Sequence, residues 1–137
     1  MDNEIRSVEV EQILHIRHQV LWPAKSPDFV KVPEDDLGNH FGLYIENKLV
    51  SVISLFADGN RIRFRKFATL QEYQNRGLGS RLLDFTIDWA REQGYREIWC
   101  DARTSAMAFY EKFGFAKFSE PFFKEEIAYF KIQKSLL

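Results

Sequence analysis

The segment of residues 61–101 constrains the fold more than any other part of the sequence. Residues 61–69 alternate between two faces like a β-strand, and residues 77–93 carry apolar side chains at helical spacing. Residues 96–101 have the apolar composition of a second strand. A strand, a helix and a strand in succession form a right-handed crossover that makes the two strands parallel. The sequence therefore predicts an α/β fold around this unit.

The flanking segments add antiparallel strands and two more helices. Residues 41–45 and 49–56 predict a hairpin, and Asp58-Gly59 predicts a turn into the strand at 61–69. Further strands are predicted at residues 4–10, 115–118 and 127–133, and helices at 11–21 and 106–113. Residues 23–39 are predicted to form a long loop with one short helical turn. No repeat or linker divides the chain. We expect one domain, residues 1–137, with a mixed, mostly antiparallel sheet flanked by helices.

Charge and cysteine content exclude several classes of protein. The formal net charge is −1, so no overall basic field attracts nucleic acid or an anionic membrane. The only cysteine, Cys100, rules out an intrachain disulfide and a cysteine-based zinc cluster. The N-terminus lacks the features of a signal peptide, and no apolar run is long enough to span a bilayer. These features indicate a cytoplasmic protein with neither a nucleic-acid nor a membrane partner.

A glycine-containing turn, Gln74-Asn75-Arg76-Gly77-Leu78-Gly79-Ser80, connects the alternating strand to the strong helix. Backbone N–H groups in the first turn of a helix lack intrahelical acceptors and carry partial positive charge, so they bind phosphate or pyrophosphate. Arg76 can add charge-assisted hydrogen bonds. The alternative is a turn that merely leads into the helix. The patterns of P-loop NTPases and of dinucleotide-binding folds are both absent.

Two segments in the expected order resemble the GNAT family of N-acetyltransferases. The first is Gln74-Asn75-Arg76-Gly77-Leu78-Gly79, which is similar to the family's acetyl-CoA-binding motif. The second is Ala106-Met107-Ala108-Phe109-Tyr110-Glu111-Lys112-Phe113-Gly114-Phe115, which is similar to a motif that follows it in the family. The resemblance implies a GNAT fold and the transfer of an acetyl group from acetyl-CoA to a primary amine by direct attack. It implies no metal.

The resemblance also implies roles for individual residues. The pantetheine arm would lie along the strand end, where the Phe67 N–H would polarise the thioester carbonyl. Tyr110 would protonate the departing thiolate as general acid. The alternative for Tyr110 is an aromatic side chain that packs on its own helix. The implied cofactor-binding residues are Phe67, Ala68, Thr69, Gln74, Asn75, Arg76, Gly77, Leu78, Gly79, Ser80 and Arg103.

Arg103 marks the one departure from the family pattern. Many members carry an asparagine at the corresponding position, where it helps to anchor the CoA arm. Arg103 either binds a CoA phosphate or pairs with Asp101, and the sequence leaves both open.

The acceptor side is less well defined. The amine must lose a proton before it attacks, and His40, Asp101 and the acidic run Glu34, Asp35 and Asp36 are candidate bases. The alternative for each is a solvated charge or a structural hydrogen bond.

Arg17 and Trp22 are candidates for the acceptor pocket, and the alternative for Trp22 is a cover over the core. One strand face carries Arg61, Arg63 and Arg65, which either form an exposed antiparallel face or recognise an acidic acceptor or the CoA 3′-phosphate. His15 and His18 are expected at the surface.

Two functions follow from these motifs. The first is an acetyl-CoA-dependent N-acetyltransferase that acts on a small-molecule or peptide amine. The second is a noncatalytic CoA-binding or regulatory module with the same fold. Exposed strand edges and the aromatic segment of residues 121–130 favour a homodimer.

Overall fold

The computed structural model describes residues 3–137. Contacts within the chain divide it into two compact units. The first unit comprises the residues up to Phe56 together with Phe64–Asp88, and the second comprises Ala57–Arg63 and Trp89–Leu137. The assignment of all 137 residues to one domain therefore stays a prediction.

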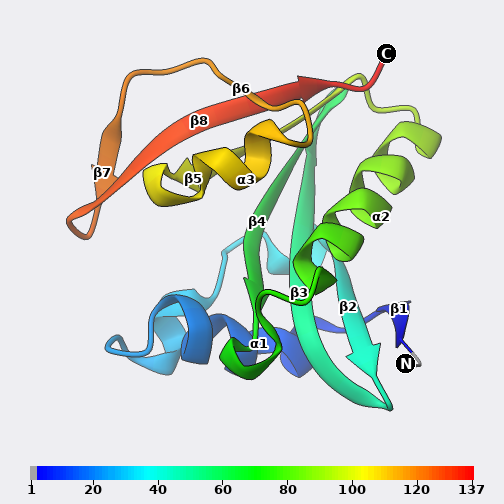
Figure 1. Cartoon of the computed structure of the whole chain (residues 1–137), viewed down its shortest axis with the longest axis vertical. Coiled ribbons are helices and arrows are strands. Elements are labelled where there is room, and N and C mark those ends of the chain that lie inside the picture. Colours follow the sequence, from blue (N-terminus) through cyan, green and yellow to red (C-terminus); the bar gives the residue numbers. More distant parts are fainter. Residues whose placement is uncertain (1–2) are drawn as a thin grey trace. The chain divides into compact units, whose positions relative to one another are not determined.

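Figure 1 shows the helices and strands of the α/β chain in sequence order. The helices are α1 (Val10–Leu21), α2 (Leu78–Glu92) and α3 (Met107–Glu111), and short 3₁₀ turns are η1 (Pro27–Val30), η2 (Asp35–Leu37), η3 (Gln71–Tyr73) and η4 (Thr104–Ala106). The strands are β1 (Asn3–Ser7), β2 (Asn39–Ile45), β3 (Lys48–Asp58), β4 (Arg61–Thr69), β5 (Glu97–Arg103), β6 (Ala116–Lys117), β7 (Phe122–Lys124) and β8 (Ile127–Ser135).

The sheet of the first unit has the strand order β1, β2, β3, β4. β1 pairs antiparallel with β2, and β2 pairs antiparallel with β3. The turn between β2 and β3 consists of Glu46 and Asn47, whose φ angles of 48° and 69° are both left-handed. Two such residues match the right-handed twist of the flanking strands, so this is a tight hairpin. The hairpin expected at 41–56 is confirmed.

Helices cover both faces of this sheet, which explains why β2 and β3 are buried along most of their length. On one face, Arg17 of α1 reaches Ser54 of β3. On the other face, Phe85 of α2 packs edge-on against Phe41 of β2, with ring centroids 5.2 Å apart. Because His40 and Phe41 are neighbours on β2, their side chains point to opposite faces.

The sheet of the second unit contains the predicted parallel pair. Arg61–Arg63 at the start of β4 pair in parallel with Glu97–Trp99 of β5, which confirms the crossover expected from the sequence. β8 pairs antiparallel with β5 over seven residues and also pairs with β6 and β7. Strand β5 alternates regularly between buried and half-buried residues.

Several details differ from the sequence-based expectation. The strand expected at 4–10 ends at Ser7, and Val10 already begins α1. Strand β7 was not predicted, and the turn after it consists of Glu125 and Glu126, which have φ angles of 50° and 70°. Helix α3 spans only Met107–Glu111, because residues 104–106 form the 3₁₀ turn η4 before it and residues 112–114 form a turn after it. The loop at 23–39 contains two 3₁₀ turns, η1 and η2.

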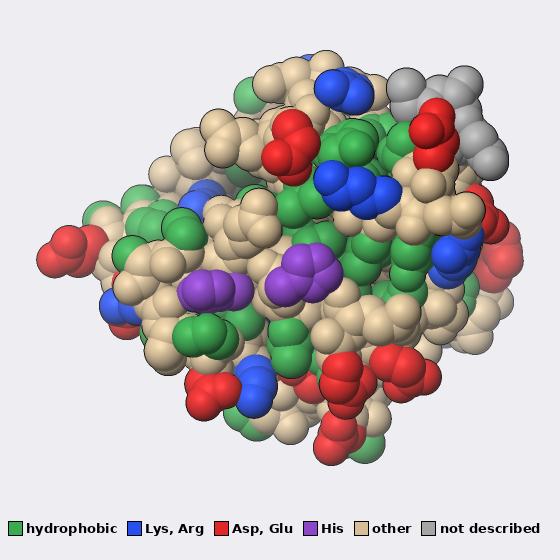
Figure 2. Space-filling model, turned by 90° about the horizontal axis from the view of Figure 1, so that it is seen from below, with side chains coloured by type: hydrophobic (Ala, Val, Ile, Leu, Met, Phe, Trp, Pro, Cys, Tyr) green, Lys and Arg blue, Asp and Glu red, His purple; other side chains and the backbone are tan. Residues whose placement is uncertain are grey.

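The surface view in Figure 2 shows histidine side chains on one face, with acidic side chains gathered along its lower edge. His15 is exposed and His18 is half-buried, as expected for surface positions on α1, whereas His40 is buried. Within residues 3–137, none of the helices has the length and apolar character that a membrane span requires.

Candidate functional site

The turn before α2 has the backbone conformation of an anion-binding loop. Asn75 and Gly77 have left-handed φ angles of 62° and 78°, and α2 begins directly afterwards at Leu78. Successive backbone N–H groups in a turn can form a concave site that binds anions. The N–H groups of the first helical turn extend this array. Residues 74–77 are exposed, so an anion can reach the turn from solvent.

The end of β4 lies against this turn. The Gln74 side-chain amide donates a hydrogen bond of 2.9 Å to the Thr69 carbonyl oxygen. The Thr69 hydroxyl also lies 2.8 Å from the Ser51 hydroxyl on β3. Lys66 has a left-handed φ of 56°, which breaks the regular strand just before Phe67. The structure therefore brings the predicted strand-end residues 67–69 and the turn together in the first unit.

The two glycines of the turn differ in what they require. A Cβ at Gly77 would meet nothing within 4 Å, so the left-handed φ of this residue is the feature that favours glycine there. A Cβ at Gly79 would lie 3.6 Å from the Phe67 ring and 3.6 Å from the Thr69 hydroxyl, which is ordinary contact. The second glycine therefore packs against the strand end and could be alanine.

The remaining predicted residues of the turn fall into two groups. Arg76 is exposed, with its guanidinium carbon 5.1 Å from the centroid of the Tyr73 ring, so its charge lies at the rim of the turn. Leu78 is buried, and its contribution on the ligand side is therefore its N–H group. Ser80 is half-buried in the first turn of α2. Arg81 is engaged elsewhere, because its Nε donates to the Asn3 side chain at 2.6 Å.

Tyr110 is held in the apolar interior of the second unit by α3. Its ring packs edge-on against Phe109 and Phe115, with centroids 5.2 and 5.8 Å away. Burial, and secondarily Cys100, raises the pKa of Tyr110 well above its ordinary value. The phenol therefore keeps its proton at neutral pH, which is the state that a general acid needs.

Cys100 and Asp101 of β5 point to opposite faces of the sheet and have different surroundings. Burial raises the pKa of the Cys100 thiol well above its usual range, so a thiolate nucleophile at this position is disfavoured. Burial also acts to raise the pKa of Asp101, but hydrogen bonds from Lys124 and Lys131 and the Arg63 charge outweigh it and lower the pKa. Asp101 is thus a stable carboxylate and a poor proton acceptor. Arg103 ends β5 opposite Tyr129, and its contact with CoA stays a prediction.

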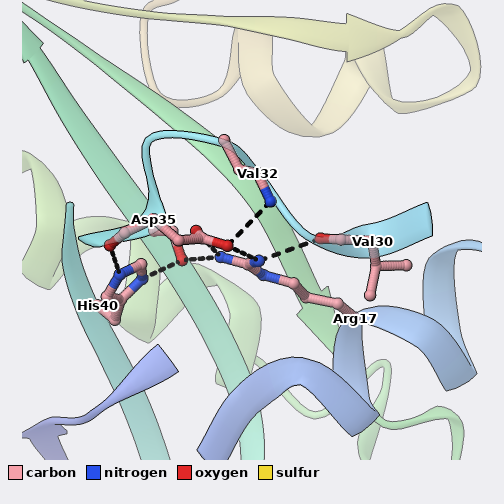
Figure 3. A network of polar contacts seen from close by, with 6 residues as sticks. Arg17, Val30, Val32, Asp35 and His40 are labelled. Carbon is pink, nitrogen blue, oxygen red and sulfur yellow. Dashed lines mark hydrogen bonds and ion pairs between the residues drawn. The ribbon is translucent and has the colours of Figure 1, made fainter. Parts of the chain in front are cut away.

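Figure 3 shows that the acceptor-side candidates Arg17, Asp35 and His40 belong to one network of polar contacts. The Arg17 guanidinium donates to both carboxylate oxygens of Asp35, at 2.9 and 2.8 Å, and to the Val30 carbonyl oxygen at 3.1 Å. It is fully buried. Arg17 therefore fastens the loop at 23–39 to α1 rather than lining an open pocket.

The same network occupies His40. Its Nε2 donates to the Asp35 carbonyl oxygen at 2.9 Å, and its Nδ1 shares a hydrogen bond of 2.7 Å with the Ser54 hydroxyl. Ser54 in turn accepts a hydrogen bond of 2.9 Å from Arg17. Both ring nitrogens have partners, so the arrangement does not favour His40 as the general base. Glu34 and Asp36 remain exposed on the loop.

Sequence reasoning missed Ser54, Lys124 and Lys131. Ser54 is a fully buried polar residue within an apolar strand, and this contrast in composition was the available signal. Lys131 meets Asp101 because β8 pairs with β5, and Lys124 reaches Asp101 from β7, which pairs with β8 and was not predicted. Among residues 3–137, no three side chains of the kinds that ligate metals gather in one place.

Comparison with known proteins identifies the family to which the sequence is similar. Residues 8–115 match the model of the acetyltransferase (GNAT) family. An uncharacterized N-acetyltransferase of Bacillus subtilis, YitI, is 30% identical over 128 residues, which are 87% of this chain and 86% of the relative.

Solved structures of low sequence identity share the fold. A putative N-acetyltransferase from Lactobacillus plantarum superposes with a TM-score of 0.89 at 20% identity and covers both chains completely. The ribosomal-protein-S18-alanine N-acetyltransferase of Escherichia coli gives 0.81 at 20% identity, covering 98% of this chain and 94% of that one. A Bacillus subtilis acetyltransferase in complex with CoA gives 0.77 at 17% identity, covering 99% and 100%.

Proposed function

The chain belongs to the GNAT family of acetyltransferases and is an N-acetyltransferase that acts on an amine, and we propose that it takes the acetyl group from acetyl-CoA. The observation that carries this proposal is the exposed turn at 74–77, with its left-handed residues Asn75 and Gly77 at the start of α2. A similar fold has been solved with CoA.

We assign the pyrophosphate of CoA to the backbone N–H groups from Asn75 to Ser80. An array of N–H groups at a helix N-terminus stabilises negative charge without making the whole protein basic, which suits a chain of formal charge −1. Arg76 adds a positive charge at the exposed rim. The pantetheine arm lies along Phe67, Ala68 and Thr69, next to the turn through the bond from Gln74 to Thr69. Arg103 contributes to a CoA phosphate.

The transfer itself requires few groups from the protein. The amine attacks the thioester carbonyl directly, and a new C–N bond forms as the C–S bond breaks. The Phe67 N–H stabilises the developing oxyanion. Tyr110 supplies a proton to the departing thiolate, because the buried phenol is protonated before transfer. The acceptor is a small-molecule or peptide amine.

The proposal also covers the cellular location and the oligomeric state of the protein. We place it in the cytoplasm, where acetyl-CoA is made and where a lone buried thiol such as Cys100 stays reduced. A homodimer, expected from the strand edges and the aromatic segment at 121–130, is part of the same proposal.

Replacing Tyr110 with phenylalanine tests the catalytic part. We expect the turnover number to fall by a factor of about 10² to 10⁴, the usual contribution of a general acid, while the affinity for acetyl-CoA changes little. Turnover is measured by thiol release from acetyl-CoA with a panel of amines, and affinity by calorimetry.

Tyr44→Phe is the matched control, because Tyr44 and Tyr110 are each 8% exposed and Tyr44 lies on β2, outside the residues assigned to acetyl-CoA or to catalysis. Its turnover should equal that of the wild type. Equal turnover in Tyr110→Phe and Tyr44→Phe would remove Tyr110 from the mechanism. Acetyl-CoA binding without thiol release from any amine would instead favour a noncatalytic role.

A further inference from the structure

One face of the sheet in the second unit gathers charged and aromatic side chains. Trp99 and Asp101 of β5 share this face, because residues two apart on a strand point the same way. Arg63 pairs with Trp99 in the parallel register, and Lys131 pairs with Asp101 in the antiparallel register. Cys100 lies between Trp99 and Asp101 on β5, so its side chain points to the opposite face.

Three cations converge on the Asp101 carboxylate. Oδ2 accepts from Arg63 at 2.6 Å and from Lys124 at 2.8 Å, and Oδ1 accepts from Lys131 at 3.0 Å. The Asp101 side chain is only 6% exposed, whereas the two lysine side chains are each 39% exposed. We call Arg63, Trp99, Asp101, Lys124 and Lys131 the Asp101 cluster. Its carboxylate lies beneath cations that reach solvent.

Aromatic rings restrict the positions of these cations. The Arg63 guanidinium carbon lies 4.6 Å from the centroid of the Trp99 ring, and the Lys131 ammonium lies 5.0 Å from the same ring. The Lys124 ammonium lies 4.9 Å from the Tyr129 ring. Cation–π contacts at these distances are attractive and limit the rotamers of long side chains. The positive groups are therefore held in place before any ligand arrives.

The cluster has more donors than acceptors. Three positive charges face one negative charge, in a chain whose formal net charge is −1. Each ammonium group has three donors and the guanidinium five, so Asp101 uses only a fraction of them. Within residues 3–137, Arg63 Nε and Trp99 Nε1 are also buried without a hydrogen-bond partner. Buried donors without partners are rare and call for an acceptor.

We propose that the Asp101 cluster binds the oxyanion of a ligand, a carboxylate or a phosphate ester, with an aromatic or apolar group beside it. Such an anion has only acceptors, which complements the excess of donors. The bound anion also reduces the repulsion among the three cations, which the single Asp101 carboxylate compensates only in part. The adjacent apolar group of the ligand packs on the rings of Phe122 and Tyr129, which stack with centroids 5.8 Å apart.

The direct test is a titration of the ¹⁵N-labelled full-length protein without CoA. The probes are phenylacetate and phenyl phosphate, with phenylacetamide as the neutral analogue of the first. We expect both anions to shift the indole N–H resonance of Trp99 in a saturable way, and phenylacetamide to leave it in place. The tighter of the two anions identifies the source of the oxyanion. Failure of both anions to shift this resonance would overturn the proposal.

A pair of double variants tests the cations. Lys124→Gln/Lys131→Gln should weaken binding of the tighter probe at least about tenfold, because two charge-assisted contacts are lost. Lys112→Gln/Lys117→Gln removes the same charge from exposed positions elsewhere in the second unit and should bind like the wild type. Equal weakening in the two variants would mean nonspecific charge attraction and would refute a defined site.

Asp101→Asn provides a second readout that does not depend on affinity in the wild type. This change leaves three cations without an internal counterion, so an external anion should stabilise the variant more than it stabilises the wild type. The expected result is a larger rise of the melting temperature with phenylacetate or phenyl phosphate than in the wild type. An equal rise in both proteins would show that the anion does not replace Asp101. If the variant does not fold, the lysine variants still decide.

Discussion

Substitution of Arg17 with methionine removes the cation at the centre of the network in Figure 3. Methionine keeps much of the length and the apolar stem of arginine but can donate no hydrogen bonds. The Asp35 side chain is 10% exposed, and among residues 3–137 its carboxylate then keeps only the hydrogen bond from the Val32 N–H at 2.9 Å. The variant therefore tests whether this buried ion pair stabilises the fold.

The expected loss is large because the pair is buried. Arg17 donates four hydrogen bonds in all, two to Asp35 and one each to Val30 and Ser54, and is fully buried. Removing one partner of a buried pair costs about 3–5 kcal/mol, because the other charge stays in the interior without compensation. Domains of this size are stable by about 5–15 kcal/mol, so the variant should lose a substantial part of its free energy of unfolding.

Urea unfolding followed by circular dichroism measures the effect through the midpoint and slope. Arg6→Met is the control, because Arg6 pairs with Glu4 at the surface and its loss should leave the midpoint unchanged. The double variant Arg17→Met/Asp35→Leu removes both charges and should recover most of the loss. A loss below about 1 kcal/mol in Arg17→Met would refute the assignment. A double variant no more stable than the single one would show that an uncompensated charge is not the cause.

Three further outcomes follow from the structure. The pKa values of Asp35 and Asp101 are lowered in the folded protein, so the stability that these carboxylates contribute is present above about pH 4, the ordinary carboxyl pKa. This stability is lost as the pH falls further. An unchanged urea midpoint between about pH 6 and about pH 3 would contradict the prediction. Replacing Glu125-Glu126 with Asn-Gly should raise the free energy of unfolding by roughly 1 kcal/mol, because both positions have left-handed φ angles, and a lower urea midpoint would count against the turn. Gly79→Ala should fold with an unchanged melting temperature, since its Cβ makes only ordinary contacts, and a clear drop would mean that the turn is packed more tightly.

Sequence patterns predicted the elements whose signals are local. The crossover from β4 through α2 to β5 follows from alternation, helical spacing and a turn between them, and each of these signals lies within about 20 residues. The strand end and the glycine turn were predicted to act together, and the bond from Gln74 to Thr69 joins them because they are five residues apart.

Contacts between distant segments could not be predicted in the same way. Asp35 and His40 were candidate bases in the sequence, but nothing there linked them or Ser54 to Arg17. Only the pairing of β2 with β3 and the position of α1 bring these residues to Arg17. Strand β7 was missed because its turn is Glu125-Glu126, which lacks the glycine or asparagine that marks a tight hairpin. Without β7, the convergence of Lys124 on Asp101 had no basis in the sequence.

The most direct test of the donor site compares two glycines that differ only in location. Gly77 and Gly59 have φ angles of 78° and 61°, and a Cβ at either meets nothing within 4 Å. Alanine at each position therefore carries a similar strain of roughly 1–2 kcal/mol. Calorimetric titration with acetyl-CoA should show binding to the wild type and to Gly59→Ala with equal affinity, and at least about tenfold weaker binding to Gly77→Ala, the equivalent of one charge-assisted hydrogen bond. Equal affinity of all three proteins, or no binding to the wild type, would contradict the assignment of the donor to this turn.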